Sequence, residues 1–149
     1  MSVKVLSKDT VYKGYGTRVD YSKTKTAALK KSVEVAFVGG TDTAGGVLAV
    51  ANPVGATVTI TEVILVVTTK ATDACTVDIG PAANATTLND TLIDGLDVNA
   101  AAGNFDNISD AGGSGGRDVS WAASEYVTIS TASGASAGLV GKLIINFIV

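Results

Sequence analysis

The chain lacks the residues on which many catalytic and metal sites depend. It contains no histidine and a single cysteine, Cys75, among 149 residues. A Ser-His-Asp or Cys-His arrangement and an imidazole-ligated zinc site are therefore excluded, and one thiol forms no internal disulfide. We expect Cys75 to be a small buried hydrophobic side chain. Since no serine stands in a recognisable nucleophile turn, the sequence predicts a protein that is not an enzyme.

Long apolar segments are also missing. The longest charge-free apolar run, residues 143–149, is far shorter than the roughly 20 residues that a membrane-spanning helix needs. The first residues, MSVKVLSKDTVYKG, carry charges where a signal peptide would have its apolar core. We therefore expect neither a membrane partner nor secretion by that route.

The most apolar and β-branched stretch is residues 56–80, which predicts two long strands joined by a polar turn at residues 70–73. Apolar residues alternate with threonine in the first strand, and this alternation shifts by one residue at Glu62. The shift predicts either a β-bulge near Glu62 or burial of Ile64 and Val66 on a second face. We expect the partner strand to end at Pro81, because proline cannot donate to a ladder.

The rest of the chain adds more short strands and few helical signals. Expected strands lie at residues 32–38, 47–51, 119–122, 126–130 and 139–149, with a tight turn at 52–55, a single helical turn at 88–93 and a loop at 110–118. In the last strand Leu143, Ile145 and Phe147 form one apolar face, which predicts a core position. The fold class is therefore all-β, an antiparallel β-sandwich, and the long central pair favours a jelly roll over an immunoglobulin-like sandwich.

Charge divides the chain into a basic arm and an acidic body. Residues 1–31 carry eight basic and two acidic residues, a net charge of +6, and the remainder carries three basic and twelve acidic residues, a net charge of −9. We predict a basic N-terminal arm that includes the first strand over residues 1–40, and a β-sandwich body over residues 41–149.

The arm is the candidate docking segment, and three hypotheses account for it. It binds its own acidic body or that of a neighbouring subunit, it docks on a larger acidic protein surface, or its cations and tyrosines bind nucleic acid. The acidic body would repel phosphate, so nucleic acid is the weakest of the three. The residues assigned to the arm are Lys4, Lys8, Tyr12, Lys13, Tyr15, Arg18, Tyr21, Lys23, Lys25, Lys30 and Lys31.

Carboxylate and amide side chains gather at residues 89–110. They are Asn89, Asp90, Asp94, Asp97, Asn99, Asn104, Asp106, Asn107 and Asp110. Such oxygens suit calcium, but their spacing does not match an EF-hand. The same residue types form the Asx-turns of long loops, and this second interpretation is favoured, so we expect neither a metal nor a cofactor.

Several segments together resemble a family of phage proteins. They are Val50-Ala51-Asn52-Pro53, residues 58–63, Cys75-Thr76-Val77-Asp78-Ile79-Gly80, residues 90–97, Ala102-Gly103-Asn104-Phe105-Asp106 and residues 133–141. The chain is similar over about residues 46–149 to the small jelly-roll proteins that decorate, or cement, the heads of tailed bacteriophages. The basic arm lies outside this resemblance.

The resemblance implies a structural virion protein on the outer surface of the phage head, made in the host cytoplasm. It implies a homotrimer that binds the major capsid protein, with the arm reaching along the shell or into neighbouring copies. The apolar face of Leu143, Ile145 and Phe147 would then pack the core or a threefold interface. The alternative is a receptor- or carbohydrate-binding module of a phage fibre or tail, with residues 89–110 as its binding surface.

Overall fold

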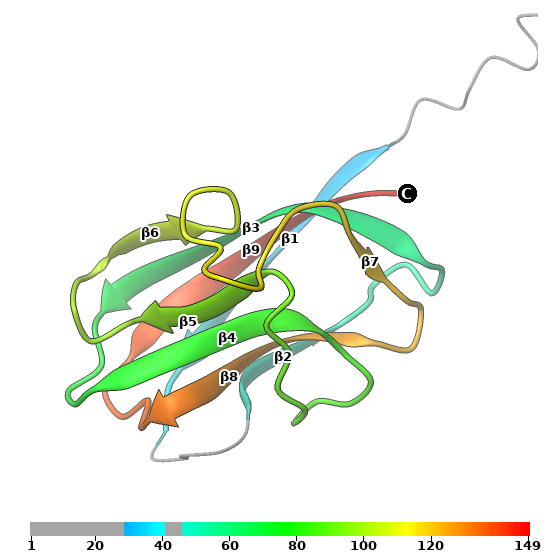
Figure 1. Cartoon of the computed structure of the whole chain (residues 1–149). Coiled ribbons are helices and arrows are strands. Elements are labelled where there is room, and N and C mark those ends of the chain that lie inside the picture. The colour runs from blue at the N-terminus through cyan, green and yellow to red at the C-terminus, as the bar shows by residue number, and fades with distance from the viewer. Residues whose placement is uncertain (1–28, 41–45) are drawn as a thin grey trace, which may run out of the picture.

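The computed structural model describes residues 29–40 and 46–149, and within them the chain forms a β-sandwich (Figure 1). Two antiparallel sheets pack face to face, and the described residues contain no helix, which confirms the predicted fold class. Sheet A has the order β1 (Lys30–Val38), β9 (Val140–Ile148), β3 (Val58–Thr69), β6 (Gly103–Asp106), with β7 (Val119–Trp121) also paired to β3. Sheet B has the order β2 (Gly46–Ala51), β8 (Tyr126–Gly134), β4 (Cys75–Ala82), β5 (Ile93–Asp97).

The core lies between the sheets and follows the alternation of the strands. In β9, which lies between β1 and β3, Leu143, Ile145 and Phe147 are buried. Trp121 of β7 is fully buried and meets the Phe147 ring edge to face, with centroids 5.8 Å apart. The predicted apolar face of the last strand is therefore occupied by the core, as its alternation indicated.

The long strand β3 contains the predicted bulge. Its register with β9 shifts between Ile60 and Glu62, after which Val63 points into the core and Ile64 points away from it, half-buried. Without the extra residue, the whole second half of the strand would have turned its apolar side chains to the opposite face. The bulge prediction is confirmed.

Two local predictions are wrong. Pro81 lies inside β4, opposite Val127 of β8, because its missing N–H points toward the β5 side, where pairing has already ended at Ile79. No helical turn forms at residues 88–93. Instead Thr91 N–H bonds to the Asn89 side chain and Leu92 N–H bonds to Ile79 O, so the backbone groups that a helix would use are already occupied.

The first strand belongs to the sandwich. It was expected at residues 32–38, and as β1 it pairs with β9 along its whole length at the edge of sheet A. Phe37 is buried between the sheets. The described part of the predicted 1–40 segment is thus largely a sheet strand, and residues 1–28 lie outside the described residues. In the described parts of the chain no helix has the length and apolar character needed to span a bilayer.

Candidate functional site

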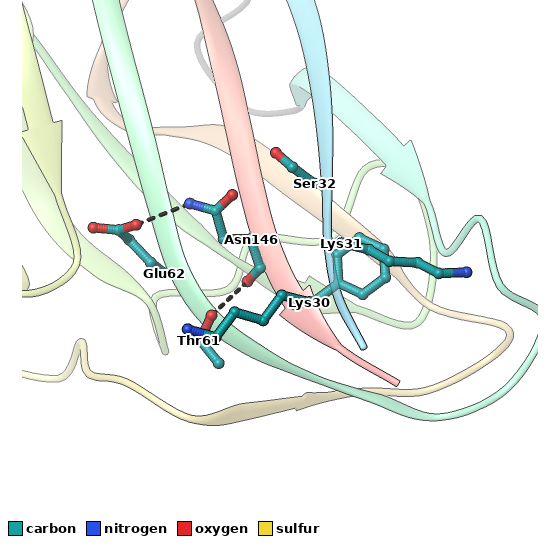
Figure 2. Close-up of a pocket in the computed structure, with 7 residues that line it drawn as sticks. Lys30, Lys31, Ser32, Thr61, Glu62 and Asn146 are labelled. Carbon is teal, nitrogen blue, oxygen red and sulfur yellow. Dashed lines mark hydrogen bonds between the residues drawn. The ribbon is translucent and has the colours of Figure 1, made fainter. Parts of the chain in front are cut away.

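The candidate site is the end of sheet A at which β1 begins, directly after the basic arm. A shallow hollow of about 350 Å³ opens there (Figure 2). Three neighbouring strands supply its walls, because β1 starts, β3 bulges and β9 ends at the same level of the sheet. The lining residues are Lys30, Lys31, Ser32, Thr61, Glu62, Asn146 and Phe147.

Hydrogen bonds across the bulge hold the polar wall of this hollow. The Asn146 side-chain amide donates to a Glu62 carboxylate oxygen at 2.8 Å, and the Thr61 hydroxyl donates to the Asn146 carbonyl oxygen at 3.1 Å. Figure 2 shows the Asn146 amide turned toward Glu62, with Lys30 extending toward Thr61 and Lys31 pointing the other way. The hollow therefore presents a carboxylate and an amide held together by a hydrogen bond, with the exposed ammonium group of Lys30 beside them.

A second hollow of about 320 Å³ lies on the other side of β1. It shares Lys31, Ser32 and Phe147 with the first, and Val33, Pro53 and Val54 complete its lining. This hollow is where the sandwich is open between the edge strands of its two sheets, so half-buried apolar side chains of the core reach its surface. The start of β1, at Lys31 and Ser32, thus lies between a polar and an apolar hollow.

The structure describes only two members of the predicted docking arm. Lys30 and Lys31 are both exposed and lie at the start of β1, on opposite faces of the strand. The other assigned residues lie outside the described part of the chain: Lys4, Lys8, Tyr12, Lys13, Tyr15, Arg18, Tyr21, Lys23 and Lys25.

The Asn/Asp cluster of residues 89–110 builds turns. The Asp97 carboxylate accepts the N–H groups of Asn99 and Ala100, and the Asp106 carboxylate accepts those of Ile108 and Ser109. These are Asx-turn bonds, as the favoured interpretation predicted. In residues 29–40 and 46–149, no three His, Cys, Asp or Glu side chains form a group that could hold a metal ion.

The outer face of sheet B holds a buried polar group that sequence reasoning missed. Asp78 of β4 is 5% exposed, and one carboxylate oxygen accepts the Gly95 N–H at 2.8 Å. Burial raises the pKa of the Asp78 carboxyl above its ordinary value; the bond from Gly95 lowers it, and the charges of Asp94 and Asp90 raise it further. An aspartate between the apolar Val77 and Ile79 looks like an ordinary exposed strand position, so the sequence gives no signal of its burial.

Asn107 is a second residue whose role the sequence did not reveal. It is 1% exposed; its side-chain oxygen accepts the Val63 N–H at 2.8 Å, and its amide donates to Gly116 O at 2.7 Å. Val63 follows the bulge and lies between the stretches of β3 that pair with β7 and β6. Asn107 therefore fills the gap that the two short strands leave at this edge of sheet A.

Cys75 is buried, as predicted. Its side chain is 2% exposed, and burial raises the pKa of its thiol, with the Asp97 charge adding to the effect. A thiol with a raised pKa forms little thiolate at neutral pH, so it is a poor nucleophile. Cys75 accordingly packs as a core side chain.

Among the described residues, exposed charged groups and hydrogen-bonding groups therefore gather at the start of β1. The Asn/Asp cluster forms turns, and Asp78 and Asn107 are buried polar groups of the sheets. No family model matches this chain, and comparisons with curated proteins and with solved structures find no match either.

Proposed function

We propose that this chain is a structural virion protein that decorates and stabilises a bacteriophage head by binding its outer surface as a trimer. The observation that carries the proposal is the strand order. With β7 set aside, the orders β1-β9-β3-β6 and β2-β8-β4-β5 support the interpretation of this sandwich as an eight-stranded jelly roll, an architecture found in viral capsid proteins. The resemblance of residues 46–149 to phage decoration proteins supports the same conclusion.

The charge distribution supports a docking role for the arm. The described residues include five basic and eleven acidic residues, a net charge of −6, whereas residues 1–28 carry six basic and two acidic ones. Asp94 and Asp97 lie on β5 and Asp106 ends β6, strands at the sheet edges opposite β1 and β2. The arm and the acidic edge therefore belong to opposite sides of the sandwich.

In the proposed mechanism the arm makes the capsid contact. Its lysines and arginine pair with an acidic surface of the major capsid protein or of an adjacent copy, and this attraction also speeds association. The polar hollow at Lys30 receives a segment of the bound partner next to the arm. The acidic body stays on the outside of the shell, where its charge keeps the particle surface soluble.

The proposal is tested by removing the arm. A variant without residues 1–28 keeps β1 and should fold, but should no longer bind heads of its own phage that lack this protein. The charge argument is tested within the full chain by Lys23→Gln with Lys25→Gln, against Lys70→Gln, an exposed lysine after β3. Co-sedimentation with heads measures both. Full binding by the truncated protein would disprove the docking role of the arm.

A further inference from the structure

The two outer faces of the sandwich differ in how they are covered. On sheet B, residues 83–92 lie across the strands: the Thr128 hydroxyl, fully buried, is within hydrogen-bonding distance of Thr87 O at 3.1 Å. A Cβ at Gly80 would collide with the Asn89 side chain, so the loop rests directly on β4. The middle of sheet B, around Gly80 and Thr128, is therefore covered by its own chain.

Sheet A carries an apolar stripe on its outer face. Ile144 of β9 lies beside Ile64 of β3, and in the next row Val66 lies beside Lys142. These apolar side chains point away from the core and stay half-exposed. At the end of the stripe Val38 of β1, which lies opposite Val140, is 72% exposed.

Charge distinguishes this face from the rest of the body. The outward side chains of β1, β9 and β3 include two lysines, Lys30 and Lys142, and two glutamates, Glu34 and Glu62, and β6 adds Asp106 beside Ile64, which gives a net charge of −1. Lys142 and Glu34 form an ion pair at 3.0 Å beside the stripe. The described residues outside this face hold a net charge of −5, most of the −6 of the described chain.

We propose that one copy of this chain contacts another through the outer face of sheet A. This inference rests on the proposed function, because it assigns the self-association of that function to one face. Two copies of an acidic body repel one another, and they repel least through this nearly neutral face. An apolar centre surrounded by charges of both signs has the composition of a protein interface, and two copies of such a face complement each other. A face that binds nucleic acid or an anionic bilayer would instead carry an excess of lysine.

The size of the face agrees with this assignment. β9 has nine residues, which at about 3.4 Å each extend about 30 Å. Four strands about 4.8 Å apart cover about 19 Å, so the flat area is about 600 Å². A standard specific interface buries about 800 Å² of each partner. A contact over this face, together with its edges, is large enough to hold copies together.

The test is the mass of the full-length protein in solution as a function of concentration. We expect light scattering after size exclusion to give a multiple of the 14.9 kDa chain mass. Ile144→Glu, which places a charge in the centre of the face, should weaken self-association about tenfold or more. Ala132→Glu adds the same charge at an exposed position on β8 of sheet B and should leave the mass unchanged.

A second variant keeps the test possible if Ile144→Glu does not fold. If circular dichroism shows that Ile144→Glu is unfolded, Val38→Glu tests the same face at a position exposed enough to accept glutamate. A wild-type protein that is monomeric throughout, or folded variants that associate as the wild type does, would overturn the inference. Head binding by the same proteins separates the two proposals. A monomer that still binds heads leaves the decoration role intact, and an Ile144→Glu variant that keeps the wild-type mass but loses head binding would assign the face to the capsid.

Discussion

Asn107 shows how much of a sheet can depend on one polar side chain. The bulge in β3 leaves the Val63 N–H facing a gap between β6 and β7, and the Asn107 side chain supplies the missing acceptor. A buried N–H without a partner costs about 1–3 kcal/mol. The bulge and Asn107 therefore form one structural unit, although they are far apart in the sequence.

We predict that Asn107→Ala lowers the free energy of unfolding by about 1–3 kcal/mol, because it leaves the Val63 N–H buried and unpaired. Urea unfolding followed by circular dichroism measures the change. Asn104→Ala, at an exposed position of β6, is the control and should change stability little. Equal stability of the two variants would show that water replaces the lost acceptor.

Asp78 predicts a pH dependence of stability. Its folded pKa lies above the ordinary value because of burial, so the folded state binds its proton more tightly than the unfolded state. The stability due to this group is fully present at low pH and is lost as the pH rises through the raised pKa. Asp78→Asn keeps the acceptor for the Gly95 N–H and cannot ionise. We expect the stability of Asp78→Asn relative to the wild type to rise from about pH 4 to pH 7, and a pH-independent difference in urea unfolding would contradict this.

At the scale of elements, β1 links the arm to the sandwich. The strand is an edge strand, yet it contributes Phe37 to the core and pairs with β9 over its whole length. Its exposed charges, Lys30, Lys31 and Glu34, are the kind that protect a sheet edge from pairing with other chains. The strand therefore serves the fold, although it lies in the basic segment of the sequence.

Truncation on either side of β1 separates these roles. Removing residues 1–28 leaves the strand and should leave the thermal unfolding midpoint unchanged. Removing residues 1–38 also takes away Phe37 and uncovers an edge of β9, and should lower the free energy of unfolding by about 3 kcal/mol or more. Calorimetry or circular dichroism measures both, and equal midpoints would show that β1 adds little to the core.

At the scale of the whole molecule, charge and apolar surface are distributed unevenly over the sandwich. The basic arm joins at β1, acidic residues lie on β5 and β6, and the apolar stripe lies on the outside of sheet A. In the two proposals the arm attaches the protein to a shell and the stripe attaches it to its own copies. Their tests are independent, because one removes residues 1–28 and the other changes Ile144 or Val38.

Although β5 and β6 were not predicted, the sequence by itself determined the fold class, seven of the nine described strands and the bulge. These follow from alternation and turn residues, which act between near neighbours, and so the buried face of β9 and the shift at Glu62 were predictable. The burial of Cys75 and the Asx-turns at Asp97 and Asp106 follow from the same local rules.

Only the tertiary structure decided which residues meet across the chain. Pro81 is tolerated in β4 because β5 ends before it, Asn107 reaches the bulge through the fold, and Asp78 is buried by elements that follow it by more than ten residues. The contrast between the covered face of sheet B and the open stripe of sheet A likewise depends on where a loop lies in space. Such contacts join residues distant in sequence, and no local pattern encodes them.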